Sequence, residues 1–533
     1  MAFTMNTPVR IIDLFAGPGG LGEGFSGHLN SHGQQSFKIG LSVEMEASAH
    51  RTLELRAFYR QFPAGEAPDA YYDFLANKLG PDPSATLFRD ERYSEQAKAA
   101  RKEAQQLTLG KNHRKINHAI EAALGGRKRD EWVLIGGPPC QAYSLVGRSR
   151  TRGIEGYRLE DDKRSNLYRE YLKIINRFEP AVFVMENVKG LLSAKHNGNS
   201  IFEKICNDLA CPGKAVRSGP RSSRHYNIFS LVTSSSGNDL LAHELQPADY
   251  VIRSEHYGVP QARHRVILLG IRSDILAAQR PATLVKHDAP VLRNVISDLP
   301  RLRSGLSKVQ DSFQAWKEAI EKGSVAVIRA LRAEGMRDVA DRMETAVQAL
   351  GRRDLRRGTT WSTAPDSETV INQNESLRNW YQDPSGWRGI CNHESRGHIE
   401  SDLLRYLFCA CFSDAAPDGK RRTPKANEFP QILAPAHANW KSGHFADRFR
   451  VQVADMPATT ITSHISKDGH YFIHYDPTQC RSLTVREAAR IQTFPDNYFF
   501  VGSRTQQYVQ VGNAVPPYLA RQIAGIVADV LGV

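Results

Sequence analysis

An apolar run that ends in a proline corner constrains the fold of this chain most. Residues 132–135, Trp-Val-Leu-Ile, lead into the segment GGPPCQAYS at 136–144. A short apolar run of this kind predicts a buried strand of a parallel sheet, and two consecutive prolines permit neither further strand pairing nor a helix. Cys140 is therefore predicted just beyond a strand end, at the edge of an open α/β sheet where ligands bind.

Two descriptions of Cys140 follow from this position, and the segment alone favours neither. A thiol held at the carboxyl edge of a sheet is a candidate nucleophile. Free cysteine is also among the most deeply buried residue types, so an inert, buried Cys140 fits the pattern equally well. The rest of the chain has to decide between the two.

The net charge of the chain limits the kinds of partner that it is expected to bind. The 533 residues carry 70 Lys and Arg against 57 Asp and Glu, a formal net charge of +13, which favours a polyanion, nucleic acid before an anionic membrane. No apolar run has the roughly 18 residues of a transmembrane helix, and no signal peptide is recognisable, so we expect a soluble, cytoplasmic protein with no membrane partner. The seven cysteines form no CxxC pair or Cys/His cluster, so we expect no metal and no disulfide framework.

A glycine-rich turn near the N-terminus predicts a strand, turn and helix of nucleotide-binding type. Residues 9–15 have the pattern of a strand, and AGPGGLGEG follows at 16–24. Glycines let the backbone approach a ligand, and the next helix offers unpaired N–H groups to an anion. A second strand at 38–43 ends at Glu44, where such folds place an acid on ribose hydroxyls. The turn alone fits a dehydrogenase, a methyltransferase or a purely structural turn.

Polar residues lie beside further strands, after a long interruption. Residues 56–130 are polar and helix-prone, and we interpret them as an insertion. The alternation then resumes with a helix at 165–178, a strand at 181–185 that runs into Glu186-Asn-Val, and a strand at 266–270 preceded by Gln-Ala-Arg-His-Arg. Each group of polar residues is thus predicted next to a strand end.

The alternation of strands and helices becomes less regular from residue 271 to about 478, where basic clusters alternate with tryptophans. Most charge runs are only solvated faces, but cations suit phosphates and aromatic rings suit stacking on bases, so we expect this region to touch nucleic acid. An amphipathic helix is predicted at 481–492 with Thr484 at its start, and a loop at 511–517 precedes a final helix.

Six segments, taken in order, resemble those of the C5-cytosine-specific DNA methyltransferase family. They are DLFAGPGGLGEGF (13–25), GGPPCQAYS (136–144), ENV (186–188), QARHR (261–265), RSLTVREAARIQTFPD (481–496) and GNAVPP (512–517). The resemblance implies an α/β, S-adenosylmethionine-dependent methyltransferase (Rossmann-like) fold with a mostly parallel, seven-stranded sheet and an inserted target-recognition domain. The implied domains are a catalytic domain at 1–270 with the insertion at about 56–130, a target-recognition domain at 271–478, and a C-terminal segment at 479–533 that completes the catalytic domain.

The resemblance also implies a covalent mechanism. C5 of cytosine becomes reactive toward a methyl donor once a thiolate has added to C6, and Cys140 matches that thiolate. Glu186 matches the carboxyl group that stabilises charge developing at N3 and the exocyclic amine. Arg265 matches the residue that contacts the cytosine O2 and helps to orient the nucleophile, whereas Arg263 is expected to support the site. Taken alone, Glu186 would be a capped strand end and the arginines surface residues, but their occurrence together with Cys140 favours catalysis.

The implied methyl donor and cofactor is S-adenosylmethionine. Phe15 is expected to pack on the adenine, Glu44 to hold the ribose hydroxyls, and Met45 to fill the place of a large apolar residue. The residues expected to bind the donor are Phe15, Ala16, Gly17, Gly19, Gly20, Glu44, Met45, Pro138, Leu167, Asn513 and Val515. The acid that contacts the adenine in the family has no counterpart at its usual place before PPCQ, where Asp90 and Asp130 are the candidates.

A cytosine inside duplex DNA cannot reach such a site, so we expect the base to be flipped out, with the loop after Cys140 closing over it. The residues expected to contact DNA are Gln141, Ser144, Arg148, Arg150 and Thr460.

The expected function is that of a DNA (cytosine-5-)-methyltransferase acting on one double-stranded DNA sequence in the cytoplasm, at the nucleoid. A cognate restriction endonuclease or defence-system proteins are the expected partners. Two alternatives are an RNA (tRNA) cytosine-5 methyltransferase and a non-catalytic DNA-binding protein of the same fold.

Overall fold

The chain forms two compact units. The computed structural model describes residues 7–126, 132–139, 167–196, 198–216, 221–234, 245–276, 280–351, 355–364, 375–415, 421–435 and 448–533. The first unit consists of Met1–Gln61, Glu91–Asp288 and Ala514–Val533, and the second of Phe62–Asp90 and Ala289–Asn513.

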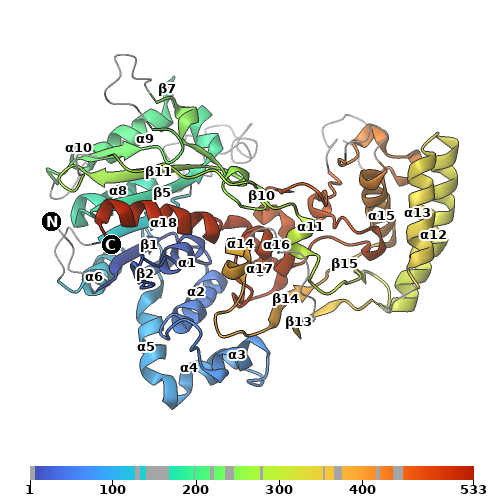
Figure 1. Ribbon diagram of the computed structural model, residues 1–533, viewed down its shortest axis with the longest axis horizontal. Coiled ribbons are helices and arrows are strands. Elements are labelled where there is room, and N and C mark those ends of the chain that lie inside the picture. The colour runs from blue at the N-terminus through green and yellow to red at the C-terminus, as the bar shows by residue number, and fades with distance from the viewer. Residues whose placement is uncertain are drawn as a thin grey trace. The chain divides into compact units, whose positions relative to one another are not determined.

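An eight-stranded sheet lies at the centre of the first unit (Figure 1), in the order β3-β2-β1-β4-β5-β11-β8, with β9 also paired to β11. The five strands from β3 to β5 are parallel, and β11 pairs antiparallel with β5, β8 and β9. The strands are β1 (Val9–Leu14), β2 (Phe37–Glu44), β3 (Ala104–Gln106), β4 (Trp132–Gly136), β5 (Val182–Val188), β8 (Tyr226–Phe229), β9 (Val251–Arg253) and β11 (His264–Arg272). The sheet confirms the predicted fold class, and the three-residue β9 adds one strand to the seven expected.

Helices cover both faces of this sheet, so its strands are apolar on both sides. Ile12 and Leu14 of β1 pack with helices α6, α8 and α9, whereas Val9 and Ile11 pack with α1 and α18. These helices are α1 (Gly20–Ser26), α6 (His113–Leu124), α8 (Leu167–Phe178), α9 (Ile201–Ala210) and α18 (Pro517–Leu531). The alternation along β1 is the period of two that separates the two apolar cores.

The region interpreted as an insertion divides between the two units. Residues 62–90, with helices α3 (Asp69–Leu75) and α4 (Pro83–Arg89), belong to the second unit. Helix α5 (Ser94–Glu103) and strand β3 belong to the first, in which β3 pairs with β2. The three residues of β3, Ala-Gln-Gln, carry no apolar alternation, so the sequence pattern gave no sign of this strand.

Three helices build the core of the second unit: α12 (Phe313–Ala333), α13 (Arg337–Ala349) and α15 (Glu400–Asp414). An antiparallel pair, β13 (Gly358–Thr363) and β14 (Gly389–Glu394), lies in the same unit. Helix α3 is held there by Tyr71, whose hydroxyl donates to the Asn497 carbonyl at 3.1 Å, and by Tyr72, whose ring stacks on Trp387 at 5.5 Å.

The predicted helix at 481–492 is present but is not amphipathic. It is α16 (Val485–Ile491), and Thr484 lies at its start as predicted, where its side chain forms a capping box with Glu487. All seven residues are buried, because its charged side chains find partners inside the unit. Arg481 makes a buried ion pair with Glu487 at 2.6 Å, and Arg486 donates to backbone carbonyls, including that of Cys391 at 2.8 Å.

Contacts also place the following helix, α17 (Arg504–Asn513), in the second unit, and the chain rejoins the first unit at Ala514. The expected domain boundaries, after 270 and after 478, therefore do not coincide with the limits of the compact units. Compactness does not test which segment recognises DNA, so the functional division stays a prediction. The remaining helices and strands are α2 (Ala47–Tyr59), α10 (Pro212–Ala215), α11 (Arg293–Ile296), α14 (Glu375–Tyr381), β6 (Lys195–His196), β7 (Asn199–Ser200), β10 (Gln261–Ala262), β12 (Gly305–Leu306), β15 (Gly397–His398) and β16 (Ala458–Thr459).

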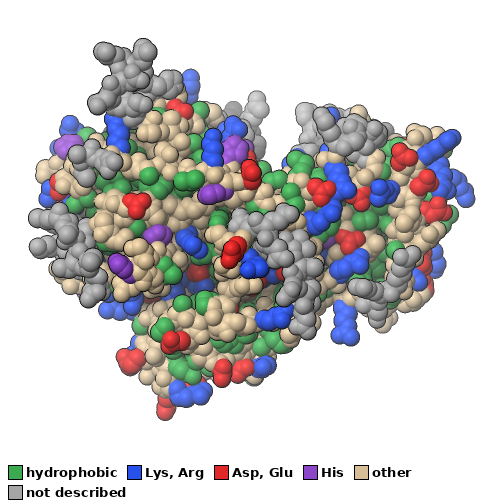
Figure 2. Space-filling model, in the orientation of Figure 1, with side chains coloured by type: hydrophobic (Ala, Val, Ile, Leu, Met, Phe, Trp, Pro, Cys, Tyr) green, Lys and Arg blue, Asp and Glu red, His purple; other side chains and the backbone are tan. Residues whose placement is uncertain are grey.

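Basic side chains of the second unit lie among acidic ones on the face shown in Figure 2. Arg332 pairs with Asp341 at 2.9 Å and with Glu344 at 2.6 Å, and Arg422 pairs with Glu428 at 2.7 Å. Such exposed pairs add little stability, about 0–1 kcal/mol each. Among the described residues, no helix is long and apolar enough to span a membrane.

Candidate active site

The sheet order places a ligand site between β1 and β4. The chain winds outward from β1 through β2 to β3 and in the other direction through β4 to β5. In an open α/β sheet, ligands bind outside the carboxyl ends of the strands at such a switch point. The residues that follow β1 and β4, together with the ends of the neighbouring strands, therefore form the candidate site.

The glycine turn after β1 is held open by a carboxylate. Phe15 begins it with a left-handed φ of 58°, and the Gly17 amide donates to Oε2 of Glu44 at 2.9 Å. The other oxygen of Glu44 accepts the amides of Met45 and Glu46, each at 2.8 Å. A Cβ added to Gly17 would meet no atom of the described residues within 4 Å, so among them the backbone here borders open space. The turn thus leaves room for a ligand beside an acidic side chain.

The segment that carries Val515 approaches the start of helix α1 closely. A Cβ on Gly20 would lie 2.2 Å from the Val515 carbonyl oxygen, so only glycine permits this approach. Gly19, with a φ of 94°, caps the helix, and its amide donates to the Ala16 carbonyl at 2.9 Å. The structure therefore brings Ala16, Gly19, Gly20 and Val515 to the same edge of the sheet.

The other residues expected to bind the donor differ in their placement. Pro138 is buried directly after β4, and Leu167 is the first residue of α8 and is half-buried. Met45 is 64% exposed, so within this chain its side chain fills no gap. Asn513 is exposed at the end of α17, in the second unit.

Strand β3 places a polar residue next to Glu44 at the carboxyl edge of the sheet. Glu44 of β2 pairs in register with Gln106 of β3, and the Gln106 amide donates to the Met45 carbonyl at 3.4 Å. Gln106 is exposed and stands where an acid was sought. Asp90 belongs to the second unit, and Asp130 lies outside the described residues. The position of Gln106 beside Glu44 could not be predicted from the sequence, because β3 has no recognisable strand pattern.

Asp13 is a buried acid that the sequence analysis passed over. It is 1% exposed, and within the described part of the chain neither carboxyl oxygen makes a hydrogen bond of full geometry. Burial raises the pKa of Asp13 to about 8, although the charge of Arg60 and the Gly22 amide act in the opposite direction. A Cβ on Gly22 would lie 3.1 Å from Oδ2 of Asp13, so this carboxyl packs against α1.

The turn after β4 brings Gly137 against Glu186. Gly136 has a φ of 158°, and a Cβ on Gly137 would lie 2.8 Å from Oε2 of Glu186. The Asn187 side chain donates to the Pro138 carbonyl at 3.4 Å. Glu186 and Asn187 lie within β5 rather than beyond it. Cys140 follows Gly137 by three residues in the sequence and lies outside the described residues.

Arg265 meets Glu186 across neighbouring strands. Arg265 of β11 pairs in register with Val188 of β5, and its Nε lies 2.8 Å from Oε1 of Glu186. Both side chains are about 15% exposed, so the ion pair remains open to a ligand on one side. Arg263 is fully buried, and burial together with the charge of Arg265 lowers its pKa well below the usual value. These positions are consistent with a contact role for Arg265 and a supporting role for Arg263.

Several predicted residues cannot be placed. Cys140, Gln141, Ser144, Arg148 and Arg150 lie outside the described residues. Thr460 is half-buried in the second unit, with no role indicated by its position alone. Among the residues that the structure covers, no cluster of His, Cys, Asp or Glu could hold a metal ion.

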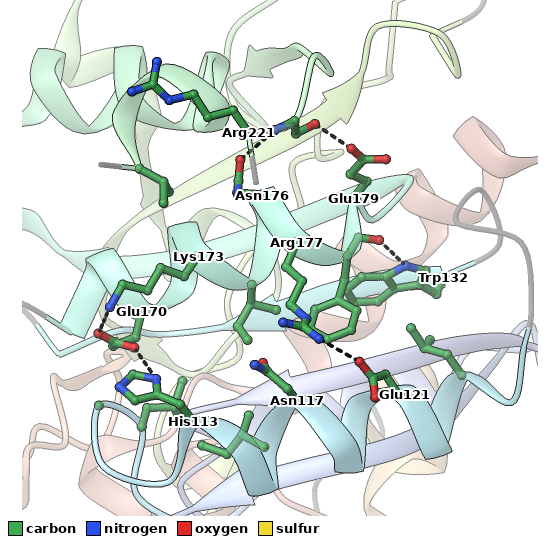
Figure 3. A pocket seen from close by; sticks show the side chains of 18 of the residues that line it. His113, Asn117, Glu121, Trp132, Glu170, Lys173, Asn176, Arg177, Glu179 and Arg221 are labelled. Carbon is green, nitrogen blue, oxygen red and sulfur yellow. Dashed lines mark hydrogen bonds and ion pairs between the residues drawn. The ribbon is translucent and has the colours of Figure 1, made fainter. Parts of the chain in front are cut away.

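A groove of about 760 Å³ lies elsewhere in the first unit, between α6 and α8 (Figure 3). Ion pairs bridge the two helices: His113 lies 3.1 Å from Glu170, and Arg177 lies 3.0 Å from Glu121. Trp132, at the start of β4, lines the same groove and donates its indole N–H to the Phe178 carbonyl at 3.3 Å. None of the residues predicted to act on a substrate lines it, so its size alone does not make it the active site.

Known proteins match this chain over nearly its whole length. The model of the C-5 cytosine-specific DNA methylase family matches residues 96–216 and 245–528. Type II methyltransferase M.Bpa9945I of Bacillus paralicheniformis is 33% identical over 98% of this chain and 99% of its own length. Type II methyltransferase M.AgeI of Thalassovita gelatinovora is 26% identical over 97% and 98%, respectively. A crystal structure of a putative DNA modification methyltransferase of an Escherichia coli prophage is 15% identical, with a TM-score of 0.48 over 98% of this chain and 100% of that one.

The mostly parallel sheet, with its glycine turn and the Glu186–Arg265 pair, defines a Rossmann-like α/β protein of the methyltransferase class. The family match extends over most of the chain, and the chain belongs to the C-5 cytosine-specific DNA methylase family. The resemblance stated from the sequence motifs is thereby confirmed.

Proposed function

We propose that this protein transfers a methyl group from S-adenosylmethionine to C5 of a cytosine in one specific double-stranded DNA sequence. The observation that carries the proposal is the Glu186–Arg265 pair, which lies against Gly137 three residues before Cys140. Relatives named type II methyltransferases match nearly the whole chain. They support a place in a restriction-modification system, with a cognate endonuclease or defence proteins as partners in the cytoplasm.

The carboxyl edge of the sheet fits S-adenosylmethionine. Gly17 leaves open space for close approach, Glu44 presents a carboxylate suited to ribose hydroxyls, and Phe15 lies at the start of the turn. Gln106, one strand farther along, supplies an amide that can both accept from and donate to the polar edge of adenine. When bound, the cofactor supplies an electrophilic methyl group on a sulfonium.

The chain's own residues make the cytosine reactive. The Cys140 thiolate forms a bond to C6, and Glu186 donates a proton to N3, where negative charge would otherwise build up. Arg265 holds Glu186 through its Nε and directs its guanidinium toward O2. After methylation at C5, solvent water takes up the C5 proton, which restores the ring double bond and expels the Cys140 thiolate, and N3 returns its proton to Glu186. The target base has to leave the duplex for this addition, so base flipping is part of the proposal.

DNA contacts are proposed for the segment after Cys140, through Gln141, Ser144, Arg148 and Arg150, and for Thr460. Phosphate contacts from these arginines would position the duplex without reading its sequence.

Expression in a host without cytosine methylation, followed by 5-methylcytosine sequencing of its DNA, tests the proposal. Methylated cytosine in one short sequence, absent with a Cys140→Ser variant, is the expected result. Unmethylated DNA in the presence of soluble protein that binds S-adenosylmethionine would overturn it. Methylation of host tRNA in the same cells would identify RNA as the substrate instead.

A further inference from the structure

A second, smaller pocket lies at the same edge of the sheet as the Glu186–Arg265 pair. Its volume is about 270 Å³, and Lys189, Arg253, His256 and Lys286 line it. Strand pairing fixes two of these next to the pair. Lys189 directly follows Val188, which is in register with Arg265, and Arg253 of β9 is in register with His264 of β11. The pocket is thus one residue away from the proposed catalytic arginine on both neighbouring strands.

The pocket brings together four basic side chains that the described residues do not neutralise. Within the described part of the chain, none of its four basic side chains forms an ion pair, and Lys189, Arg253, His256 and Lys286 are all exposed. Asp249 is the one acid lining it, and its Oδ2 already accepts the Gln246 amide at 2.8 Å. Uncompensated cations around a concave surface attract an anion more strongly than cations on a flat one.

Several basic residues elsewhere in the first unit are paired with acids. Arg56 pairs with Glu23 at 2.5 Å, and Arg224 pairs with Asp274 at 2.8 Å. In the groove between α6 and α8, carboxylates form ion pairs with basic side chains: Glu170 pairs with both His113 and Lys173, and Glu121 pairs with Arg177 (Figure 3). At these sites carboxylates compensate the positive charge, whereas the four bases of the smaller pocket form no ion pair with any described residue.

We propose that this pocket binds backbone phosphates of the DNA substrate beside the flipped nucleotide. The inference rests on the proposed function and assigns to it a phosphate anchor formed by Lys189, Arg253 and Lys286, with His256 at its border. The volume lies below the roughly 300–1,000 Å³ of small-molecule sites, and a phosphate with its sugar needs less space than a free nucleotide. An arginine can bind a phosphate through two N–H groups, and the lysines act as point charges. Such contacts hold the duplex in register without reading its sequence.

The test compares two triple variants that lose the same charge. The anchor variant, Lys189→Gln/Arg253→Gln/Lys286→Gln, removes the three positive charges of the proposed phosphate anchor. The groove variant, Lys173→Gln/Arg177→Gln/Arg221→Gln, removes three positive charges from the larger groove. Binding of each protein to a duplex with the methylated sequence, and to one without it, is measured by fluorescence anisotropy across a series of salt concentrations. S-adenosylmethionine binding in the absence of DNA verifies that both variants are folded.

The anchor variant is expected to bind both duplexes about tenfold more weakly, or worse, at 0.1 M salt, and to reduce the slope of log K against log salt by about 2–3. The groove variant should keep the wild-type slope to within about 0.5. An anchor variant with an unchanged slope overturns the phosphate assignment, even where the wild-type protein methylates DNA. A loss confined to the methylated sequence also overturns it, because phosphate contacts affect all sequences alike. Failure of the proposed function is recognised separately, as a wild-type protein that does not methylate DNA.

Discussion

Gly137→Ala probes the juxtaposition on which the proposed chemistry depends. The added Cβ would lie 2.8 Å from Oε2 of Glu186, whereas an ordinary contact begins at 3.4 Å, so the carboxylate has to move by about 0.6 Å. Gly137 is not in the left-handed region, so alanine fits its backbone. Since a displacement of about 1 Å at a catalytic group costs roughly 10²-fold in rate, we expect kcat to fall about 10- to 30-fold.

The assay is single-turnover methyl transfer to duplex DNA, with binding of S-adenosylmethionine and the free energy of unfolding measured in parallel. Gly40→Ala is the matched control, because its added Cβ would lie 3.5 Å from Ala123 and from the Ile11 carbonyl, within ordinary contact. Binding of the cofactor should change less than about threefold in both variants, since neither added methyl group enters the glycine turn. A Gly137→Ala enzyme with a rate within twofold of the wild type would refute the placement of Glu186 beside this turn.

Three other substitutions test separate parts of the structure. Gln106→Ala should weaken S-adenosylmethionine binding about 3- to 10-fold in calorimetry, through loss of about one hydrogen bond, whereas Asp90→Ala should leave it unchanged, and the reverse pattern would contradict the assignment of Gln106. Asp13→Asn tests a pH dependence: the folded-state pKa of about 8 lies above the unfolded value of about 4, so wild-type stability is fully present below pH 4 and is lost as the pH rises through 8. The variant should therefore gain thermal stability over the wild type at pH 8 and lose that advantage near pH 5, and equal melting temperatures at both values would refute the buried acid. Glu487→Gln breaks the fully buried pair with Arg481 and should lower the free energy of unfolding in urea by about 3–5 kcal/mol, against less than about 1 kcal/mol for Glu344→Gln, which only loses the exposed pair with Arg332.

The elements that the sequence predicted well are those whose pattern is strong and local. Strands β1, β4 and β5 form at the predicted apolar runs, because a parallel strand buried on both faces has a recognisable composition, although β5 continues through Glu186 to Val188. Thr484 begins helix α16 as predicted, and the structure adds Glu487 as its partner in a capping box.

The elements that the sequence did not reveal depend on contacts between distant segments. Strand β3 is defined only by its pairing with β2, so Gln106 could not be found from a three-residue polar stretch. Helices α3 and α4 leave the first unit because Tyr71 and Tyr72 find partners more than 300 residues away, which no local pattern encodes. Helix α16 was expected to expose one face. Its charged residues are buried because Arg481, several carbonyl groups and the carboxylates of Asp298 and Asp496 surround them.

Asp13 and the pocket around Lys189 illustrate a second limit. Both consist of ordinary residue types. Among the residues described, the Asp13 carboxyl has no hydrogen-bond partner of full geometry, and the bases of the pocket have no ion pair; these absences are what single them out. A sequence shows which groups are present but not which of them remain uncompensated after folding. That information comes from burial and geometry, and it directs attention to groups outside the recognised motifs.

The central claim, covalent activation of cytosine by Cys140, is tested most directly with a duplex that carries 5-fluorocytosine in the methylated sequence. Fluorine at C5 cannot leave as a proton does, so the methylated adduct cannot eliminate the thiolate. We predict a stoichiometric protein–DNA complex that survives denaturation, requires S-adenosylmethionine and yields, on proteolysis, a cross-linked peptide containing Cys140. Methyl transfer to ordinary DNA by a Cys140→Ser enzyme, or a cross-link at another residue, would contradict the account.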